Sequence, residues 1–217
     1  MSSPKLHLYM LGGACSMAPH ILLREAELPF THTLFRRADV VAKGSYPEEL
    51  LALNPKGKVP TLLYNDEVIT ENAALLTLTG QLVPEKQLLG TTVLETARVK
   101  EWLNYLATEI HATTFGMLFR PERFVDDPAL KEHVRAKGRE MLLQRYKYID
   151  EQLEGKEWAV GERFTAADAY LMPFFWWGLN VMKMDMEGQY PNYARVVRNV
   201  KARPKAAEAL KLEGVDF

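Results

Sequence analysis

The chemistry of this chain centres on one loop, "GGACSMAPH" at residues 12–20, which holds the only cysteine among 217 residues, Cys15. An apolar run precedes the loop and a helical pattern follows it. We therefore expect free backbone N–H groups and the positive end of a helix dipole beside the thiol. That position stabilises a thiolate, on Cys15 or on a bound ligand, and lowers its pKa. Ser16 adds a hydroxyl donor. On residue type alone, the alternative is that Cys15 is a small buried hydrophobic residue.

Dithiol chemistry within the chain is excluded by the residues that follow the cysteine. Ser16, Met17 and Ala18 come next, so the second cysteine of a C-x-x-C motif is missing. Any redox cycle at Cys15 would therefore need a thiol from outside the chain.

Composition narrows the possible partners and the compartment. Lys plus Arg number 27 and Asp plus Glu 28, giving a net charge of -1, which argues against a general nucleic-acid binder. No stretch approaches the ~20 apolar residues of a membrane span, and the apolar run at 5–11 is too short for a signal peptide. A single cysteine cannot form an internal disulfide, so we expect a cytoplasmic protein. The five histidines are scattered, and we expect no metal centre.

Two kinds of pattern divide the chain near residue 85. The first part alternates between strand and helix patterns in the order β-α-β-α-β-β-α, which predicts a partly parallel sheet. The predicted elements are 5–11, 16–28, 30–35, 47–53, 59–64, 67–70 and 71–83. The second part is helical throughout, at 95–119, 128–153, 164–182, 193–203 and 205–214. We expect domains at 1–84 and 91–217, joined by a linker at 85–90.

One helix start has its own signature. In "RFTAADA", Thr165 can cap the apolar helix while Asp168, three residues on, reaches back to the cap. Such a capping box favours helix formation, and it has no bearing on function.

Six motifs, in order, resemble those of the glutathione S-transferase family, and of its bacterial beta class most of all. The resemblance covers nearly the whole chain, and the motifs that carry it are "GACSMAPHILLREAEL", "LNPKGKVPTL", "ITENAALL", "VPEKQLLG", "EWLNYLATEIHATTF" and "GERFTAADAYL". The resemblance implies a thioredoxin-like N-terminal domain, an all-helical C-terminal domain and a homodimer. It also implies that glutathione binds between the domains as the co-substrate.

The resemblance further implies which residues hold the γ-glutamyl end and the peptide of glutathione. Val59 and Pro60 match a Val-cis-Pro pair whose valine backbone binds the peptide as an added strand would. Glu71 and Asn72 match a Glu-Ser pair, in which Glu71 would pair with the ammonium group and Asn72 would help to hold the carboxylate. Asn in place of Ser is a departure that we expect to alter the geometry of binding. Without the resemblance, Glu71 and Asn72 would merely start a helix.

Other implied contacts come from one predicted helix and one loop. Asn104, Thr108 and His111 stand at i, i+4 and i+7 on one face of the helix and match polar positions that reach glutathione. His111 would donate a hydrogen bond to the thiolate or carry its proton, although a histidine at a helix edge can equally be a solvated residue. Lys43 matches a lysine that reaches the glycine carboxylate, and Arg36 and Arg37 are alternatives for that charge.

The activity implied is transfer of glutathione to a small hydrophobic electrophile, with Cys15, Ser16 and His111 as catalytic residues. Apolar candidates for the electrophile pocket are Phe115, Met117, Phe119, Trp176 and Trp177, each of which can instead be core packing. Two other functions stay open. One is a glutathione-dependent thiol transferase or reductase that forms a mixed disulfide at Cys15. The other is a non-catalytic ligand binder on the same fold.

Overall fold

A four-stranded mixed sheet forms in the first third of the chain. The structure, a computed structural model, describes residues 4–217, so the first three residues of the predicted domain 1–84 lie outside the described part. The strands are β1 (Leu6–Leu11), β2 (Thr31–Phe35), β3 (Thr61–Tyr64) and β4 (Glu67–Thr70). Their order is β2-β1-β3-β4, with β1 parallel to β2 and the other two pairs antiparallel. The partly parallel sheet that the sequence predicts is thus confirmed.

Helices connect and cover these strands. Between the strands lie α1 (Met17–Glu25), α2 (Arg37–Lys43) and α3 (Glu48–Leu53), and α4 (Asn72–Leu82) follows β4. Only α2 was absent from the sequence prediction, because none of its residues is buried and it therefore carries no apolar stripe. The connection from β3 to β4 is the tight hairpin expected at Asn65 and Asp66, with Tyr64 opposite Glu67.

From residue 84 onwards the described chain contains helices and turns and no strand. The α-helices are α5 (Val93–Tyr105), α6 (Gly116–Phe119), α7 (Lys131–Gln152), α8 (Ala166–Trp176), α9 (Met186–Gln189), α10 (Pro191–Lys201) and α11 (Pro204–Glu213). Short 3₁₀ turns lie at Pro84–Lys86, Pro121–Arg123 and Pro128–Leu130. The fold class expected from the sequence, thioredoxin-like and then all-helical, is confirmed.

The long helix predicted over 95–119 is wrong in one respect. Between α5 and α6 the chain forms a π-helix, Leu106–Phe115, and a second one, Trp177–Val181, follows α8. In the first, Thr113 Oγ1 donates to Thr108 O at 2.8 Å and Thr114 Oγ1 donates to Glu109 O at 2.7 Å, a five-residue spacing that matches the wider turn. The α-helical spacing therefore does not carry residue 104 and residue 111 onto one face.

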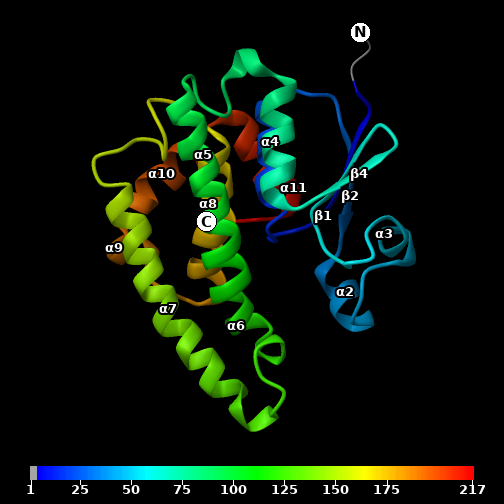
Figure 1. Ribbon diagram of the computed structural model, residues 1–217, viewed down its shortest axis with the longest axis vertical. Coiled ribbons are helices and arrows are strands. Elements are labelled where there is room, and N and C mark those ends of the chain that lie inside the picture. The colour runs from blue at the N-terminus through cyan, green and yellow to red at the C-terminus, as the bar shows by residue number, and fades with distance from the viewer. Residues whose placement is uncertain (1–3) are drawn as a thin grey trace.

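One large apolar cluster joins the sheet-bearing part to the helical part. It includes Cys15, Met17 and Leu22 beside α1, and Leu103 and Tyr170 in the helical part, all buried. Figure 1 shows the sheet on one side, the long helices α5 and α7 on the other, and α4 and α11 between them. Because α1 packs against α4, α8 and α11, its N-terminal end is fixed by both parts of the molecule. Within residues 4–217, no helix is long and apolar enough to cross a membrane.

Candidate functional site

The loop before α1 is held in place by the helical part. At Gly12, a Cβ atom would meet the Glu213 carbonyl oxygen at 2.8 Å, and at Gly13, where φ is +65°, it would meet the Trp176 ring at 2.9 Å. The Gly13 N–H donates to Glu213 Oε2 at 3.1 Å, and Trp177 Nε1 donates to Gly13 O at 2.8 Å. The two glycines are thus required because α11 and the end of α8 approach the loop so closely.

A buried ion-pair network supports the same loop. Glu213 Oε1 lies 2.8 Å from His20 Nδ1, and neither side chain is exposed. Arg24 Nε donates to His20 Nε2 at 2.9 Å, so His20 Nδ1 is the nitrogen that donates to Glu213. Sequence reasoning missed Glu213 because its partner is 193 residues away.

Cys15 is a buried, protonated thiol at neutral pH, which agrees with the alternative of a buried cysteine and not with a Cys15 thiolate. It is only 5% exposed, and Sγ donates to Val59 O at 3.4 Å. Burial raises the pKa of Cys15 to about 11, and the carboxylates of Glu71 and Glu213 add to the rise, while Asn72 opposes it. The helix N-terminus does not offset the loss of hydration.

Ser16 does not face the sulfur. Its hydroxyl is fully buried, accepts from Leu11 N at 3.1 Å and donates to Leu11 O at 3.2 Å. Both bonds close the turn between β1 and α1, so the structure gives Ser16 a role in holding the loop.

Asn72, Tyr170 and Cys15 meet at the start of α4. Asn72 is 6% exposed, and its side chain lies beside the Cys15 thiol and the Tyr170 hydroxyl, where it lowers the pKa of each. Burial nevertheless raises the pKa of Tyr170 well above its ordinary value. Within the described part of the chain, the buried Asn72 Oδ1 has no hydrogen-bond partner. Tyr170 was missed because a tyrosine in the most apolar helix is indistinguishable from core.

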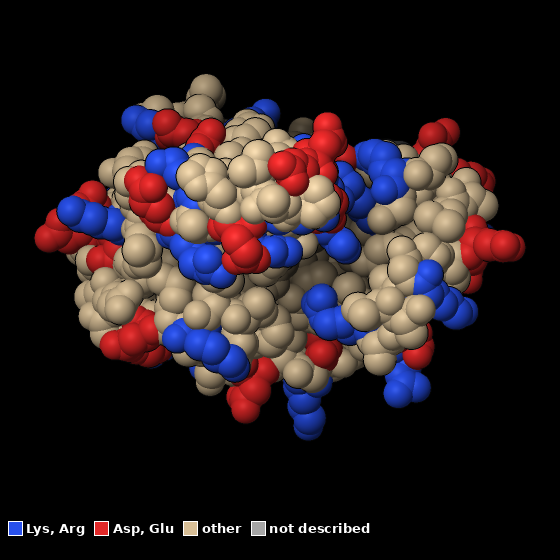
Figure 2. Space-filling view, turned by 90° about the horizontal axis from the view of Figure 1, so that it is seen from below, with Lys and Arg blue, Asp and Glu red and all other residues tan. Residues whose placement is uncertain are grey.

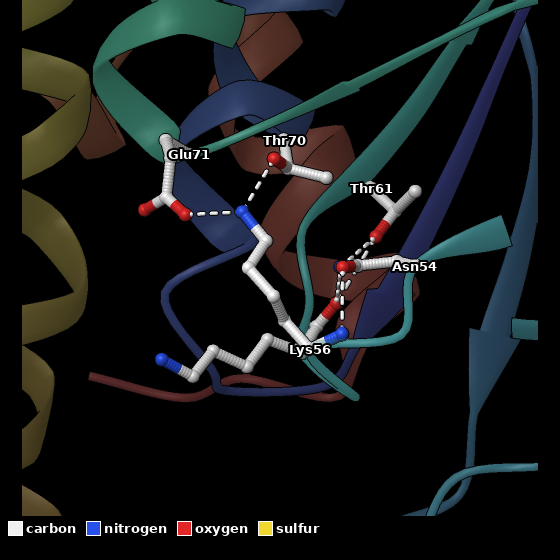
Figure 3. Close-up of polar contacts among 6 residues, drawn as sticks. Asn54, Lys56, Thr61, Thr70 and Glu71 are labelled. Carbon is white, nitrogen blue, oxygen red and sulfur yellow. Dashed lines mark hydrogen bonds and ion pairs between the residues drawn. The ribbon is translucent and has the colours of Figure 1, made fainter. Parts of the chain in front are cut away.

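Glu71 has a strained backbone and is already paired with a cation. Its φ is +71°, which is unusual for any residue but glycine and clusters at functional sites. Lys56 Nζ lies 2.5 Å from Glu71 Oε1 and donates to Thr70 Oγ1 at 2.6 Å (Figure 3). The hydrogen bond from Lys56 holds the pKa of Glu71 below its usual range.

The peptide bond between Val59 and Pro60 is cis, as the family resemblance implied.

His111 lies in the π-helix against two aromatic rings. Its ring centroid is 5.4 Å from Trp177 and 5.7 Å from Phe174. Burial lowers the pKa of His111 to about 4; Lys58 and Arg123 act in the same direction, whereas Glu71 opposes them. The imidazole is therefore neutral at neutral pH and within electrostatic reach of Glu71.

The side chains of Asn104 and Thr108 bond to carbonyl groups of their own helix. Both are exposed, and both bond to their own helix: Asn104 Nδ2 donates to Lys100 O and Thr108 Oγ1 donates to Asn104 O, each at 2.9 Å. Asn104 lines a groove with Ala73 and Thr77 of α4, and Cys15 is not among the residues that line this groove.

Arg37 bonds to the backbone of the Cys15 loop. Arg37 Nη2 donates to Gly12 O at 3.1 Å, whereas Lys43 is exposed at the end of α2, and Arg36 lies 4.0 Å from Asp39. Seen from the end where α2, α3 and α6 lie, the surface is hollowed near its middle, with Lys and Arg side chains gathered around the hollow (Figure 2).

Of the apolar candidates for an electrophile pocket, two belong to the core. Phe115 and Trp177 are 1% and 5% exposed, whereas Phe119 is 40% exposed and Met117 and Trp176 are partly buried. Sequence reasoning missed Tyr46, whose ring packs on Phe35 at 5.4 Å. The Tyr46 hydroxyl lies within electrostatic reach of Cys15, Arg37 and Arg120, and burial raises its pKa to about 12.

No group of three or more metal-ligating side chains occurs within residues 4–217. The arrangement around Cys15 instead offers neutral hydrogen-bond donors, a protonated thiol, an amide and an imidazole, beside a carboxylate and several cations. Such a site can bind a zwitterionic ligand and stabilise a sulfur anion.

The fold and this site together define a thioredoxin-like domain fused to an all-helical one. The profile described as "Glutathione S-transferase, N-terminal domain" matches residues 13–78, and that described as "Glutathione S-transferase, C-terminal domain" matches residues 106–204. Glutathione S-transferase GstA of Escherichia coli O157:H7 is 37% identical to this chain, and the match covers 97% of this chain and 100% of GstA.

Two solved structures of glutathione S-transferases are also similar to this chain. A sphingomonad glutathione S-transferase complexed with glutathione is 30% identical over 97% of this chain and 100% of its own, with a TM-score of 0.81. The bacterial beta-class enzyme of Sphingomonas chungbukensis is 31% identical over 97% and 100%, with a TM-score of 0.79. The chain belongs to the glutathione S-transferase family and has bacterial beta-class enzymes among its relatives.

Proposed function

We propose that this glutathione transferase uses the thiol of glutathione, and not its own cysteine, as the nucleophile that attacks a small hydrophobic electrophile. The observation that supports this is the state of Cys15, a thiol 5% exposed whose pKa burial raises to about 11. At neutral pH only about one molecule in ten thousand would carry a Cys15 thiolate. A mixed disulfide at Cys15 is therefore disfavoured.

We infer that glutathione binds along the cleft-facing ends of β3, β4 and α1. Glu71 and Asn72 would hold the γ-glutamyl end, and the backbone of Val59 next to Pro60 would hold the peptide. Arg37 and Lys43 are both exposed, but Arg37 bonds to Gly12 O in the Cys15 loop and is therefore better placed for the glycine carboxylate. The side-chain bonds of Asn104 and Thr108 to their own helix do not favour a direct contact.

In the proposed reaction the glutathione thiol loses its proton to solvent, and the thiolate accepts hydrogen bonds from its surroundings. Cys15 Sγ–H, the Asn72 amide and neutral His111 are the available donors, and Ser16 acts by holding the loop. The thiolate then forms a bond to the electrophilic carbon, and the leaving group departs with its bonding electron pair. With a pKa of about 4, His111 is too weak a base to remove the proton, so hydrogen-bond donation is the role we assign to it.

Conjugation of 1-chloro-2,4-dinitrobenzene tests this assignment. The Cys15→Ser variant keeps a donor at the same place and is expected to retain conjugation. The Asn72→Ala variant, which removes a donor to a charged sulfur, should lose about tenfold or more in kcat/KM. If conjugation were absent while the wild type reduced glutathionyl disulfides and Cys15→Ser did not, the thiol transferase alternative would replace this one. No retention on immobilised glutathione would favour a non-catalytic binder.

We also propose a homodimer formed across α4 and α5. A groove of about 520 Å³ between these helices is lined by apolar side chains, among them Ile69, Leu78 and Leu103, and by the polar side chains of Gln81, Lys100 and Asn104. Nearby, Val93 and Leu94 at the start of α5 are 91% and 67% exposed. Exposed apolar surface of this kind is typical of an interface. Light scattering at micromolar concentration should give twice the mass of one chain.

The remaining expectations stay proposals. We propose domains at 1–84 and 91–217 with a linker at 85–90, and a cytoplasmic location, since the one cysteine is free and a reducing compartment suits it. The net charge of -1 and the absence of a basic excess give no support to a nucleic-acid partner.

A further inference from the structure

The turn that carries Lys56 is anchored by a buried asparagine. Asn54, 2% exposed, accepts through Oδ1 from Lys56 N at 3.2 Å. Its Nδ2 donates to Lys58 O and to Thr61 Oγ1, both at 2.9 Å (Figure 3). The turn is thereby tied to β3, so the direction in which Lys56 leaves the backbone is set by the fold.

From this turn the Lys56 side chain reaches the end of β4. Figure 3 shows its ammonium between Thr70 and Glu71, with Nζ 2.6 Å from Thr70 Oγ1 and 2.5 Å from Glu71 Oε1. Thr70 lies opposite Thr61 in the hairpin, so the same strand pair positions both ends of the contact. The Lys56 ammonium group thus forms an ion pair with the carboxylate of Glu71.

We propose that Lys56 competes with the amino group of the thiol peptide for Glu71, and so sets how strongly the protein selects an α-amino group at the γ-glutamyl end. The inference rests on the proposed function, in which Glu71 pairs with the ammonium of glutathione. Both groups are –NH₃⁺ cations with three donors, and two of them at one carboxylate repel each other. The Lys56 contact to Glu71 Oε1 and the binding of the glutathione ammonium group to the same carboxylate therefore weaken each other.

The contact is weak enough to be displaced. The side chains of Lys56 and Glu71 are 46% and 70% exposed, so water and salt compete for both. Exposed ion pairs of this kind change an equilibrium constant by about two- to fivefold. The strained φ of +71° at Glu71 places the carboxylate at the end of β4 independently of Lys56. Removal of Lys56 is therefore expected to leave the carboxylate in position.

Calorimetric titration with two ligands isolates the competition. The ligands are glutathione and its des-amino analogue, in which hydrogen replaces the α-amino group of the γ-glutamyl residue. The ratio of the dissociation constants, analogue over glutathione, measures selection for the amino group. In Lys56→Met this ratio should rise by about two- to fivefold at low ionic strength.

Lys58→Met is the matched control. Lys58 lies in the same turn and acts on Glu71 only through its charge, because it makes no hydrogen bond to Glu71 within the described structure. Its loss should therefore change the ratio less than the loss of Lys56 does. Lys56→Gln, checked by its thermal unfolding midpoint, provides a second variant in case the first is poorly folded.

An unchanged or lower ratio in both Lys56 variants would overturn the inference and leave the proposed function standing, provided that the wild type binds glutathione. Failure of the wild type to bind glutathione would overturn both. Glu71→Gln should bring the ratio close to one, and a ratio that stayed high would show that another group selects the amino group.

Discussion

The protonation of Cys15 shows burial overcoming a helix N-terminus. A charge at a helix end gains about 0.3–1 kcal/mol. Raising the thiol pKa from 9.0 to about 11 corresponds to about 3 kcal/mol in the other direction. Motif reasoning identified the loop and its helix but could not weigh these two terms, because the exposure of Cys15 depends on α4 and α8, which lie far away in the sequence.

His111 should make the stability of the protein depend on pH. Its folded pKa of about 4 lies below the ordinary histidine value of 6.5, so between these values the unfolded chain binds a proton that the folded protein does not. Stability is therefore present at neutral pH and is lost as the pH falls through this window. The free energy of unfolding, measured with urea, should fall between neutral pH and pH 4.5 by about 1–2 kcal/mol more in the wild type than in His111→Asn. Equal pH dependence would contradict this account.

Among the elements, the capping box at α8 is predictable from sequence and testable. Asp168 Oδ1 accepts from Ala159 N at 2.7 Å, and Oδ2 accepts from Thr165 N at 2.7 Å and Thr165 Oγ1 at 3.0 Å. Asn supplies one acceptor oxygen, so Asp168→Asn leaves a buried N–H unpaired. We expect a loss of about 1–3 kcal/mol in urea unfolding above pH 7, where the carboxyl, whose pKa burial raises to about 6, is ionised.

The control for this prediction is Asp127→Asn. Asp127 caps the 3₁₀ turn Pro128–Leu130 by accepting from Ala129 N at 2.9 Å, in an exposed position. Water can replace that bond, so the variant should lose less than about 1 kcal/mol. If Asp168→Asn cost no more than Asp127→Asn, the capping box would not stabilise α8 as described.

Order and type of the elements were predictable because each buried strand or helix carries its own periodicity. The π-helix at Leu106–Phe115 was not, because its register depends on threonine hydroxyls and on packing against Phe174 and Trp177. The same limit applies to the site. Family motifs pointed to Glu71, Asn72 and Val59, which the fold brings near Cys15. Tyr46 and Lys56 could be recognised only once the turns were folded against the sheet.

At the scale of the whole molecule, the helical part contacts the Gly12–Gly13 loop of the sheet-bearing part. Alanine substitutions at two glycines test whether these contacts position the loop. Gly13 and Gly44 both have φ of +65°, but a Cβ at Gly13 would lie 2.9 Å from Trp176, whereas at Gly44 nothing lies within 4 Å. Ala at either position adds about 1–2 kcal/mol of backbone strain. Gly13→Ala should lose at least about 1 kcal/mol more than Gly44→Ala, because the Trp176 ring must move.

The two glycine variants should also differ in activity. Displacing Trp176 disturbs the loop that carries Cys15, so Gly13→Ala should lower kcat/KM, and Gly44→Ala, at the exposed end of α2, should not. Equal unfolding free energies and equal activities would show that the helical part does not position the loop.

The most direct test of the central claim is titration of thiolate by its ultraviolet absorbance. In the free protein we predict no thiolate at neutral pH, with absorbance rising only towards the pKa of about 11. On adding glutathione, one thiolate should appear at neutral pH, and it should appear equally in Cys15→Ser. A neutral-pH thiolate in the free wild type that disappears in Cys15→Ser would contradict the claim and make Cys15 the nucleophile.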